Sequence, residues 1–369
     1  MKIKRVFIVG MAFCLSFSVM WSCTTPENDM NIVELQMPKI DDQSKALLDF
    51  FQASGDYINS PASPFLIKAE EVEANKINYL LLDIRYHEDY VAGHIDGAIN
   101  IDRENIISFL KTFNSFQYEK IVIIDNTGQG SAYVVSILRA LGYGNAYALK
   151  FGMSVWNSKF AFNWTEKIGN RYSEYLTDEN KPKKSAGKYP VIKTKGKTIS
   201  EILEIRAQEE INYNYSVTIE TLVENLEDYY IVNYWPKAIY DEVHIKGAIW
   251  YGPKTSMKPQ TDLSTLPTNK KIVIYCYTGQ SSSALVGYLR ILGYDAYSLR
   301  YGYNAIGHSE AISNGWNGFV AAEEVHNYEI VEGTSPSKVV EAKSNKITHP
   351  DLSFKHREVV QPDPREVCD

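Results

Sequence analysis

One cysteine in the second half of the chain lies where the sequence predicts chemistry. Cys276 follows an apolar run, residues 272–274, and precedes a segment that opens a predicted helix. A loop between a strand and a helix directs successive backbone N–H groups at one point, and the helix dipole adds partial positive charge. Both effects favour a thiolate over a thiol. We therefore expect Cys276 to be a nucleophile on the floor of a pocket, with Gly279 allowing the tight turn.

The residues directly after Cys276 are the candidates for holding an anionic sulfur species or substrate. Their backbone N–H groups would converge on the space above the sulfur atom. They are Tyr277, Thr278, Gly279, Gln280 and Ser281.

The chain repeats itself at a distance of about 150 residues. Three blocks recur in the same order, which indicates a tandem duplication. They are GHIDGAI at 93–99 and VHIKGAI at 243–249, IVIIDNTGQ at 121–129 and IVIYCYTGQ at 272–280, and LRALGY at 138–143 and LRILGY at 289–294.

Each copy combines short apolar runs with one stretch of helical periodicity that stops at a glycine. The expected strands are residues 79–83, 120–124 and 146–149 in the first copy, and 229–233, 271–275 and 296–299 in the second. The expected helices are residues 131–141 and 282–292. This order of elements predicts an α/β fold with two domains, each a parallel sheet flanked by helices.

The two copies differ at the position of the nucleophile. Asp125 stands in the first copy where Cys276 stands in the second. A carboxylate lacks the nucleophilic sulfur that Cys276 supplies, so the first domain is expected to be catalytically inactive. The loop after Asp125, residues 126–130, resembles a phosphate cradle, although a short Gly-containing loop is weak support for a ligand site.

These motifs together resemble the rhodanese family. Asp83-Ile84-Arg85 followed by GHIDGA matches its D-x-R and G-H-I-x-G-A signature, and residues 276–281 match its active-site loop, C-x-x-G-x-(R/T/S). The resemblance implies that Cys276 takes sulfane sulfur from a donor such as thiosulfate or 3-mercaptopyruvate. The sulfur would be held as a persulfide, stabilised by the N–H groups of residues 277–281, and passed to cyanide or a thiol. No metal and no organic cofactor is implied.

The second copy departs from the family pattern. Asn233 and Trp235 replace the D-x-R pair, and Val243 replaces the usual glycine. We interpret the D-x-R motif as a device that fixes loops, and His94 and His244 as structural residues. Ser281 stands where single-domain rhodaneses often have an arginine, so anion binding would depend on N–H groups or on charges from elsewhere.

Three functions other than sulfur transfer involve a loop of this kind. A phosphatase of this fold requires C-x5-R, and Ser282 stands where that arginine would be. A thiol carrier would normally have a C-x-x-C partner. The main alternative is a non-catalytic binding or scaffold module of the cell envelope.

The N-terminus predicts export and a lipid anchor. Three basic residues within 1–5 precede an apolar run at 6–20, which is typical of a secretory signal. Ser22-Cys23 at its end resembles the lipobox of bacterial lipoproteins, which implies lipidation of Cys23 and attachment to an envelope membrane, facing the periplasm or exterior. An uncleaved anchor and a plain signal peptide are the alternatives. The formal charge of −7 argues against a nucleic-acid partner, because no basic surface is left over to neutralise phosphates.

The expected organisation follows from these features. It comprises a signal peptide at 1–22, a lipid-anchored spacer and helix at 23–62, rhodanese-like domain 1 at 63–165, a linker and helix at 166–214, rhodanese-like domain 2 at 215–325, and a polar tail at 326–369. Cys368 in that tail is interpreted as an incidental thiol.

Replacing Cys23 with alanine is expected to abolish incorporation of labelled fatty acid into the chain, because the thiol is the predicted acceptor. The measurement is metabolic labelling of cells that express the full chain, with Cys14→Ala as a control that keeps the label. Labelling that persists in Cys23→Ala would contradict the lipoprotein prediction.

Overall fold

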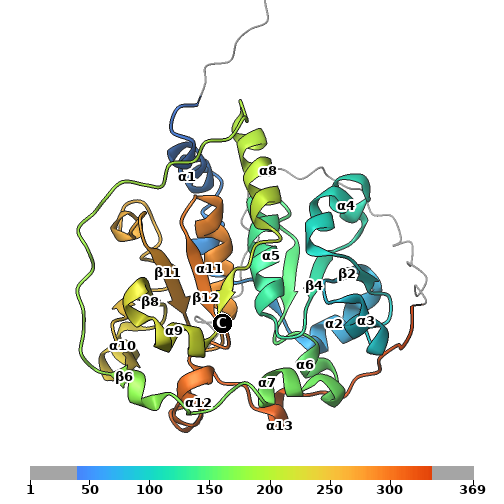
Figure 1. Cartoon of the computed structure of the whole chain (residues 1–369). Helices are drawn as coiled ribbons and strands as arrows, with labels where there is room; N and C mark the ends of the chain where they lie inside the picture. The colour runs from blue at the N-terminus through green and yellow to red at the C-terminus, as the bar shows by residue number, and fades with distance from the viewer. Residues whose placement is uncertain (1–39, 335–369) are drawn as a thin grey trace, which may run out of the picture. The chain divides into compact units, whose positions relative to one another are not determined.

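The computed structural model describes residues 40–334, which contain two copies of one α/β unit (Figure 1). Both five-stranded sheets are parallel throughout and have the same strand order. The first contains β1 (Leu66–Ile67), β5 (Ala146–Leu149), β4 (Lys120–Ile124), β2 (Tyr79–Asp83) and β3 (Ile99–Asn100). The second contains, in the same order, β7 (Ser216–Val217), β12 (Ala296–Leu299), β11 (Lys271–Tyr275), β8 (Tyr229–Asn233) and β10 (Ile249–Trp250). The predicted fold class and the duplication are confirmed.

Helices surround both sheets. In the first copy they are α2 (Ala69–Asn75), α3 (His87–Ala92), α4 (Ile106–Thr112), α5 (Gln129–Ala140), α6 (Met153–Trp156) and α7 (Phe162–Thr165). In the second they are α9 (Ile219–Glu224), α10 (Lys237–Glu242), α11 (Gln280–Ile291) and α12 (Asn304–Ser313), whereas the last helix, α13 (Ala321–Glu324), packs against the first copy. Two more, α1 (Gln43–Ala53) and α8 (Ile199–Glu210), precede the copies. The helices predicted at 131–141 and 282–292 correspond to α5 and α11.

The central strands are buried on both faces because each has an apolar side chain at every core position. Successive residues of β4 belong to different cores: Ile121 and Ile123 face a central core that spans both copies, whereas Val122 faces an outer core of the first copy. In β11, Ile272 and Ile274 face the same central core. One apolar interior therefore joins the two copies.

Helices α5 and α11 form the middle of that interior, where Figure 1 shows them side by side. Every residue of both helices is buried. They approach closely at Gly287, where a Cβ atom would come within 2.9 Å of both the Cβ of Ser136 and the carbonyl oxygen of Tyr133. Only a residue without a side chain permits this spacing.

Helix α8 joins the segment between the copies to the central core. It begins with a capping box in which the Thr198 side chain accepts from the N–H of Glu201, and the Glu201 side chain accepts in return from the N–H of Thr198. The helix contacts α1, α5 and α11. Before it, β6 (Leu176–Thr177) pairs antiparallel with β9 (His244–Ile245), which holds the predicted linker against the second copy.

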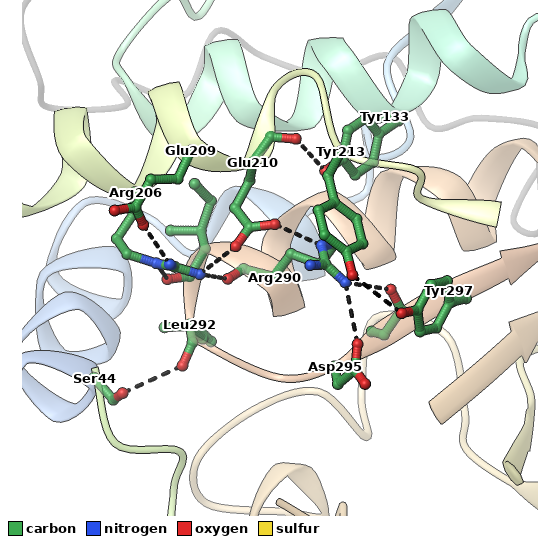
Figure 2. Close-up of polar contacts among 12 residues, drawn as sticks. Ser44, Tyr133, Arg206, Glu209, Glu210, Tyr213, Arg290, Leu292, Asp295 and Tyr297 are labelled. Carbon is green, nitrogen blue, oxygen red and sulfur yellow. Dashed lines mark hydrogen bonds and ion pairs between the residues drawn. The ribbon is translucent and has the colours of Figure 1, made fainter. Parts of the chain in front are cut away.

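A buried ionic network anchors α8 to the end of α11 (Figure 2). The Glu210 carboxylate accepts from Arg290 Nε at 2.6 Å and from Arg206 Nη2 at 2.5 Å. Arg206 Nη2 also donates to the carbonyl oxygen of Arg290, and the Arg290 guanidinium stacks 3.4 Å from the ring centroid of Tyr213. Two cations therefore depend on one buried carboxylate.

From Phe319 onward, through α13, the chain returns to the outer core of the first copy. Val331 and His94 exchange both backbone hydrogen bonds, at 2.9 Å each, and the indole N–H of Trp156 donates to the carbonyl oxygen of Glu329. The sequence assigned residues 326–334 to a polar tail, and the structure places them against the first copy. Ile330, packed against the outer core there, supplies the apolar contact.

The predicted signal peptide, Cys23 and Cys368 lie outside the described residues. Within residues 40–334, no helix combines the length and the apolar character that crossing a membrane requires. In the same range, no cluster of three or more His, Cys, Asp or Glu side chains forms that could hold a metal ion.

Replacing Glu210 with glutamine is expected to lower the free energy of unfolding by about 3–5 kcal/mol, because Arg290 loses its buried counter-charge. The Glu210 and Arg290 side chains are only 8% and 7% exposed, so water cannot replace the lost charge. The measurement is urea unfolding followed by circular dichroism.

Glu209→Gln is the matched control. Glu209 pairs with the same Arg206, but its side chain is 53% exposed, so we expect a loss below about 1 kcal/mol. Equal losses for the two variants would show that the buried network does not hold α8 in place.

Candidate active site

Cys276 lies directly after β11, and the helix that follows it, α11, begins four residues later. The intervening turn ends at Gly279, whose φ of 84° lies in the left-handed region that favours glycine. The backbone N–H of Gly279 donates to the Cys276 sulfur at 3.2 Å. The predicted strand–loop–helix arrangement, with a backbone N–H directed at the sulfur, is therefore present.

Two serine hydroxyls extend this environment. The Cys276 thiol donates to Ser282 Oγ at 3.7 Å, and Ser282 Oγ lies 2.8 Å from Ser298 Oγ. Neither serine was among the predicted site residues. Ser282 could have been found from the sequence, because Ser131 occupies the corresponding position of the first copy. Ser298 belongs to the next strand, and no sequence pattern connects it with Cys276.

The expectation of an open pocket above the sulfur is wrong, because Cys276 is 0% exposed. The two copies pack loop against loop at this point. Gln280 Oε1 accepts from the backbone N–H of Phe151 at 2.8 Å, and Gln129 Oε1 accepts from that of Tyr301 at 2.7 Å. Each loop therefore sends a glutamine into the other copy, which closes the interface between them.

The other predicted loop residues are also buried. Thr278 accepts from the Gln280 side-chain amide at 3.2 Å, and Tyr277 stacks on Trp235 with ring centroids 5.1 Å apart. Ser281 is 7% exposed. The structure brings all five residues together around the cysteine, with the side chains of Tyr277, Thr278 and Gln280 engaged in packing and hydrogen bonding.

The D-x-R motif and the two histidines have structural roles, as the sequence predicted. Asp83 and Arg85 form a buried ion pair at 2.6 Å, whereas Asn233 donates to the Tyr275 hydroxyl instead. His94 stacks on Tyr90 in the first copy, and His244 stacks in the same way on the tyrosine at the corresponding position, four residues before it.

In the first copy, the Asp125 carboxylate itself fills the loop that precedes α5. It accepts from the N–H groups of Gly128 at 2.6 Å and Gly130 at 2.9 Å, and from the Ser131 hydroxyl at 2.8 Å. The resemblance of this loop to a phosphate cradle is therefore misleading, because the chain supplies its own anion.

A cavity of about 560 Å³ opens next to Asp125. It lies at the carboxyl ends of β2 and β4, where ligands bind in α/β sheets, and the described residues that line it include Asp125 but not Cys276. Arginines from both copies contribute to it, namely Arg103 and Arg300. This cavity thus lies beside the aspartate of the copy predicted to be inactive, whereas Cys276 of the other copy is fully buried.

The sequence profile of the rhodanese-like domain matches residues 68–159 and 193–309. The chain belongs to the rhodanese-like domain family. The thiosulfate sulfurtransferase GlpE of Pseudomonas entomophila is 26% identical over 101 residues, which cover 27% of this chain and 84% of that protein. The GlpE of Shewanella oneidensis is 30% identical over 77 residues, which cover 21% and 74%.

Among solved structures, SseA from Escherichia coli, described in connection with 3-mercaptopyruvate sulfotransferases, matches with 15% identity and a TM-score of 0.24. The match covers 64% of this chain and 97% of SseA. The family model therefore covers both copies, and the curated relatives that match part of the chain include thiosulfate sulfurtransferases.

Cys276 is expected to react with iodoacetamide at least about tenfold more slowly in the native protein than in urea, because alkylation of a fully buried sulfur requires an opening step. Mass spectrometry of the Cys276 peptide gives the rate separately from the other cysteines.

An Asp125→Cys variant provides the comparison within the same fold. Its thiol would lie beside the open cavity, so we expect it to be alkylated faster than Cys276 in the native protein. Native Cys276 that reacts as fast as in urea would contradict the closed arrangement.

Proposed function

We propose that the protein is a sulfurtransferase that moves sulfane sulfur from a donor such as thiosulfate or 3-mercaptopyruvate to a thiophilic acceptor through a Cys276 persulfide. The observation that carries this proposal is the hydrogen bond from the Gly279 N–H to the Cys276 sulfur, at the N-terminus of α11. A donor N–H and the positive end of a helix both stabilise a thiolate. The names of the curated relatives support the same reaction class.

The first copy indicates how a persulfide would be held. The carboxylate of Asp125 lies beyond its Cβ atom and accepts hydrogen bonds from the Gly130 N–H and the Ser131 hydroxyl. The corresponding groups in the second copy are the N–H of Ser281 and the hydroxyl of Ser282. The outer sulfur of a Cys276 persulfide would project into the same region, so these groups would stabilise its negative charge.

The reaction consists of two displacements at sulfur. The Cys276 thiolate attacks the outer sulfur of thiosulfate, the S–S bond of the donor breaks, and sulfite leaves with the electron pair. Cyanide or a thiolate then attacks the outer sulfur of the persulfide. The second S–S bond breaks, and the Cys276 thiolate is regenerated without a cofactor.

Access to the sulfur requires movement in this proposal. Because Cys276 is 0% exposed, the loop must separate from the first copy before a donor can enter. The bonds from Gln280 to Phe151 and from Gln129 to Tyr301 are the contacts that such an opening would break. Each is a single neutral hydrogen bond, whose loss costs about 1 kcal/mol.

We also propose that the protein works at the bacterial cell envelope, held by a lipid on Cys23. The support is the signal-like N-terminus and the Ser22-Cys23 pair.

The chain without residues 1–23 is expected to gain one sulfur atom of mass on Cys276 when it is incubated with thiosulfate or 3-mercaptopyruvate, and to release thiocyanate when cyanide follows. Cys276→Ser should reduce both signals to the background, because the hydroxyl cannot form a persulfide. Intact-protein and peptide mass spectrometry measure the first signal, and a colorimetric assay measures the second.

Cys368→Ser is the matched control and should retain full activity. If neither donor adds a sulfur atom and Cys276→Ser changes nothing, the sulfurtransferase proposal fails. A second candidate would then apply, a non-catalytic rhodanese-like binding module of the envelope. The full burial of Cys276, together with the open cavity beside Asp125, favours this second candidate.

A further inference from the structure

The cavity beside Asp125 contains charged groups that the fold does not use. Arg85 also lines it, but its guanidinium is paired with Asp83. The Asp125 carboxylate is satisfied by the N–H groups of its own loop. The Arg85 and Asp125 side chains therefore stabilise the fold, and ligand binding must depend on the other charged side chains that line the cavity.

Two guanidinium groups and two carboxylates remain, and one of these carboxylates, Glu104, already accepts from the Asn212 side-chain amide. Arg103, Arg300 and Asp102 line the cavity, and none of them has an ion-pair partner among residues 40–334. The Arg300 Nε donates to the Ser216 hydroxyl at 3.0 Å, and this is the single hydrogen bond of its side chain within the described part of the chain. Charges of both signs therefore lie around one space without pairing with each other.

Tyr215 lies between the two arginines. The Arg103 guanidinium stacks over its ring at 5.8 Å from the centroid, and Arg300 comes from the strand end beside it. Burial raises the pKa of the Tyr215 hydroxyl, so this group stays protonated and can donate a hydrogen bond to a ligand. The arrangement suits a carboxylate, which two guanidinium groups and a hydroxyl can receive together.

We propose that this cavity binds a small zwitterion of the α-amino-acid class, with its carboxylate at Arg103 and Arg300 and its ammonium group at Asp102. A ligand with one positive and one negative charge would pair with the two guanidinium groups and with the Asp102 carboxylate, which form no ion pair with each other among the described residues. At about 560 Å³, the cavity has room for an amino acid with a side chain. This site is separate from Cys276 and does not depend on sulfur transfer.

A multiply charged anion fits the cavity less well. The carboxylates of Asp102, Glu104 and Asp125 all line the same space, and they would repel a second negative charge on phosphate or thiosulfate. A zwitterion has no net charge and meets this repulsion only at its carboxylate, next to the arginines.

The test uses the full chain carrying Cys276→Ser, so that its result is independent of sulfur transfer. The probes are the standard free amino acids, screened by thermal shift and then measured by titration calorimetry. We expect at least one of them to bind. Its decarboxylated amine and its deaminated acid should each bind at least about tenfold more weakly, because each lacks one charged contact.

Arg103→Gln and Arg300→Gln should each weaken binding of that amino acid about tenfold or more, and Asp102→Asn should also weaken it. The matched control is Arg171→Gln, an exposed arginine outside the cavity, which should leave binding unchanged. Arg300 is exposed, so its variant keeps the test valid even if Arg103→Gln does not fold.

The proposal is overturned if no amino acid binds, or if the amine or the acid alone binds as tightly as the amino acid. It is also overturned if the variants of both cavity arginines bind like Arg171→Gln. Binding of thiosulfate or phosphate without any amino acid would instead identify an oxyanion site.

Discussion

The contact between α5 and α11 is the constraint on which the rest of the structure depends. The two helices approach so closely at Gly287 that no side chain fits there, and their N-terminal loops are consequently pressed together. Gln129 and Gln280 bridge these loops in both directions. The same packing buries Cys276, so the position of the cysteine and the joining of the two copies have one physical cause.

The two copies share one loop architecture but place it in different surroundings. In the first, an aspartate occupies the ring of N–H groups and remains beside a cavity lined with charges. In the second, the Cys276 sulfur takes that place and aromatic rings pack around the neighbouring Tyr277. The loss of the D-x-R pair is part of this difference, since Trp235 adds to the aromatic packing where Arg85 forms an ion pair.

Most of the fold could be predicted from the sequence, because the strands β2, β4, β8 and β11 are continuous apolar runs and both central helices end before a glycine. The contrast between Asp125 and Cys276 was equally visible, since it lies inside a repeated block. Burial of the cysteine was not predictable, because it results from hydrogen bonds between Gln280 and Phe151, which are far apart in the chain. The cavity escaped prediction for the same reason: Arg103 and Arg300 meet only when the two copies pack.

The pairing of Val331 with His94 has a consequence for how the protein is made. The first copy emerges from the ribosome early, yet the segment that completes its outer surface is translated after the whole second copy. Until then, the backbone groups of His94 and the indole of Trp156 lack these partners. The first copy therefore reaches its final form only at the end of synthesis, and premature termination anywhere in the second copy would leave both copies incomplete.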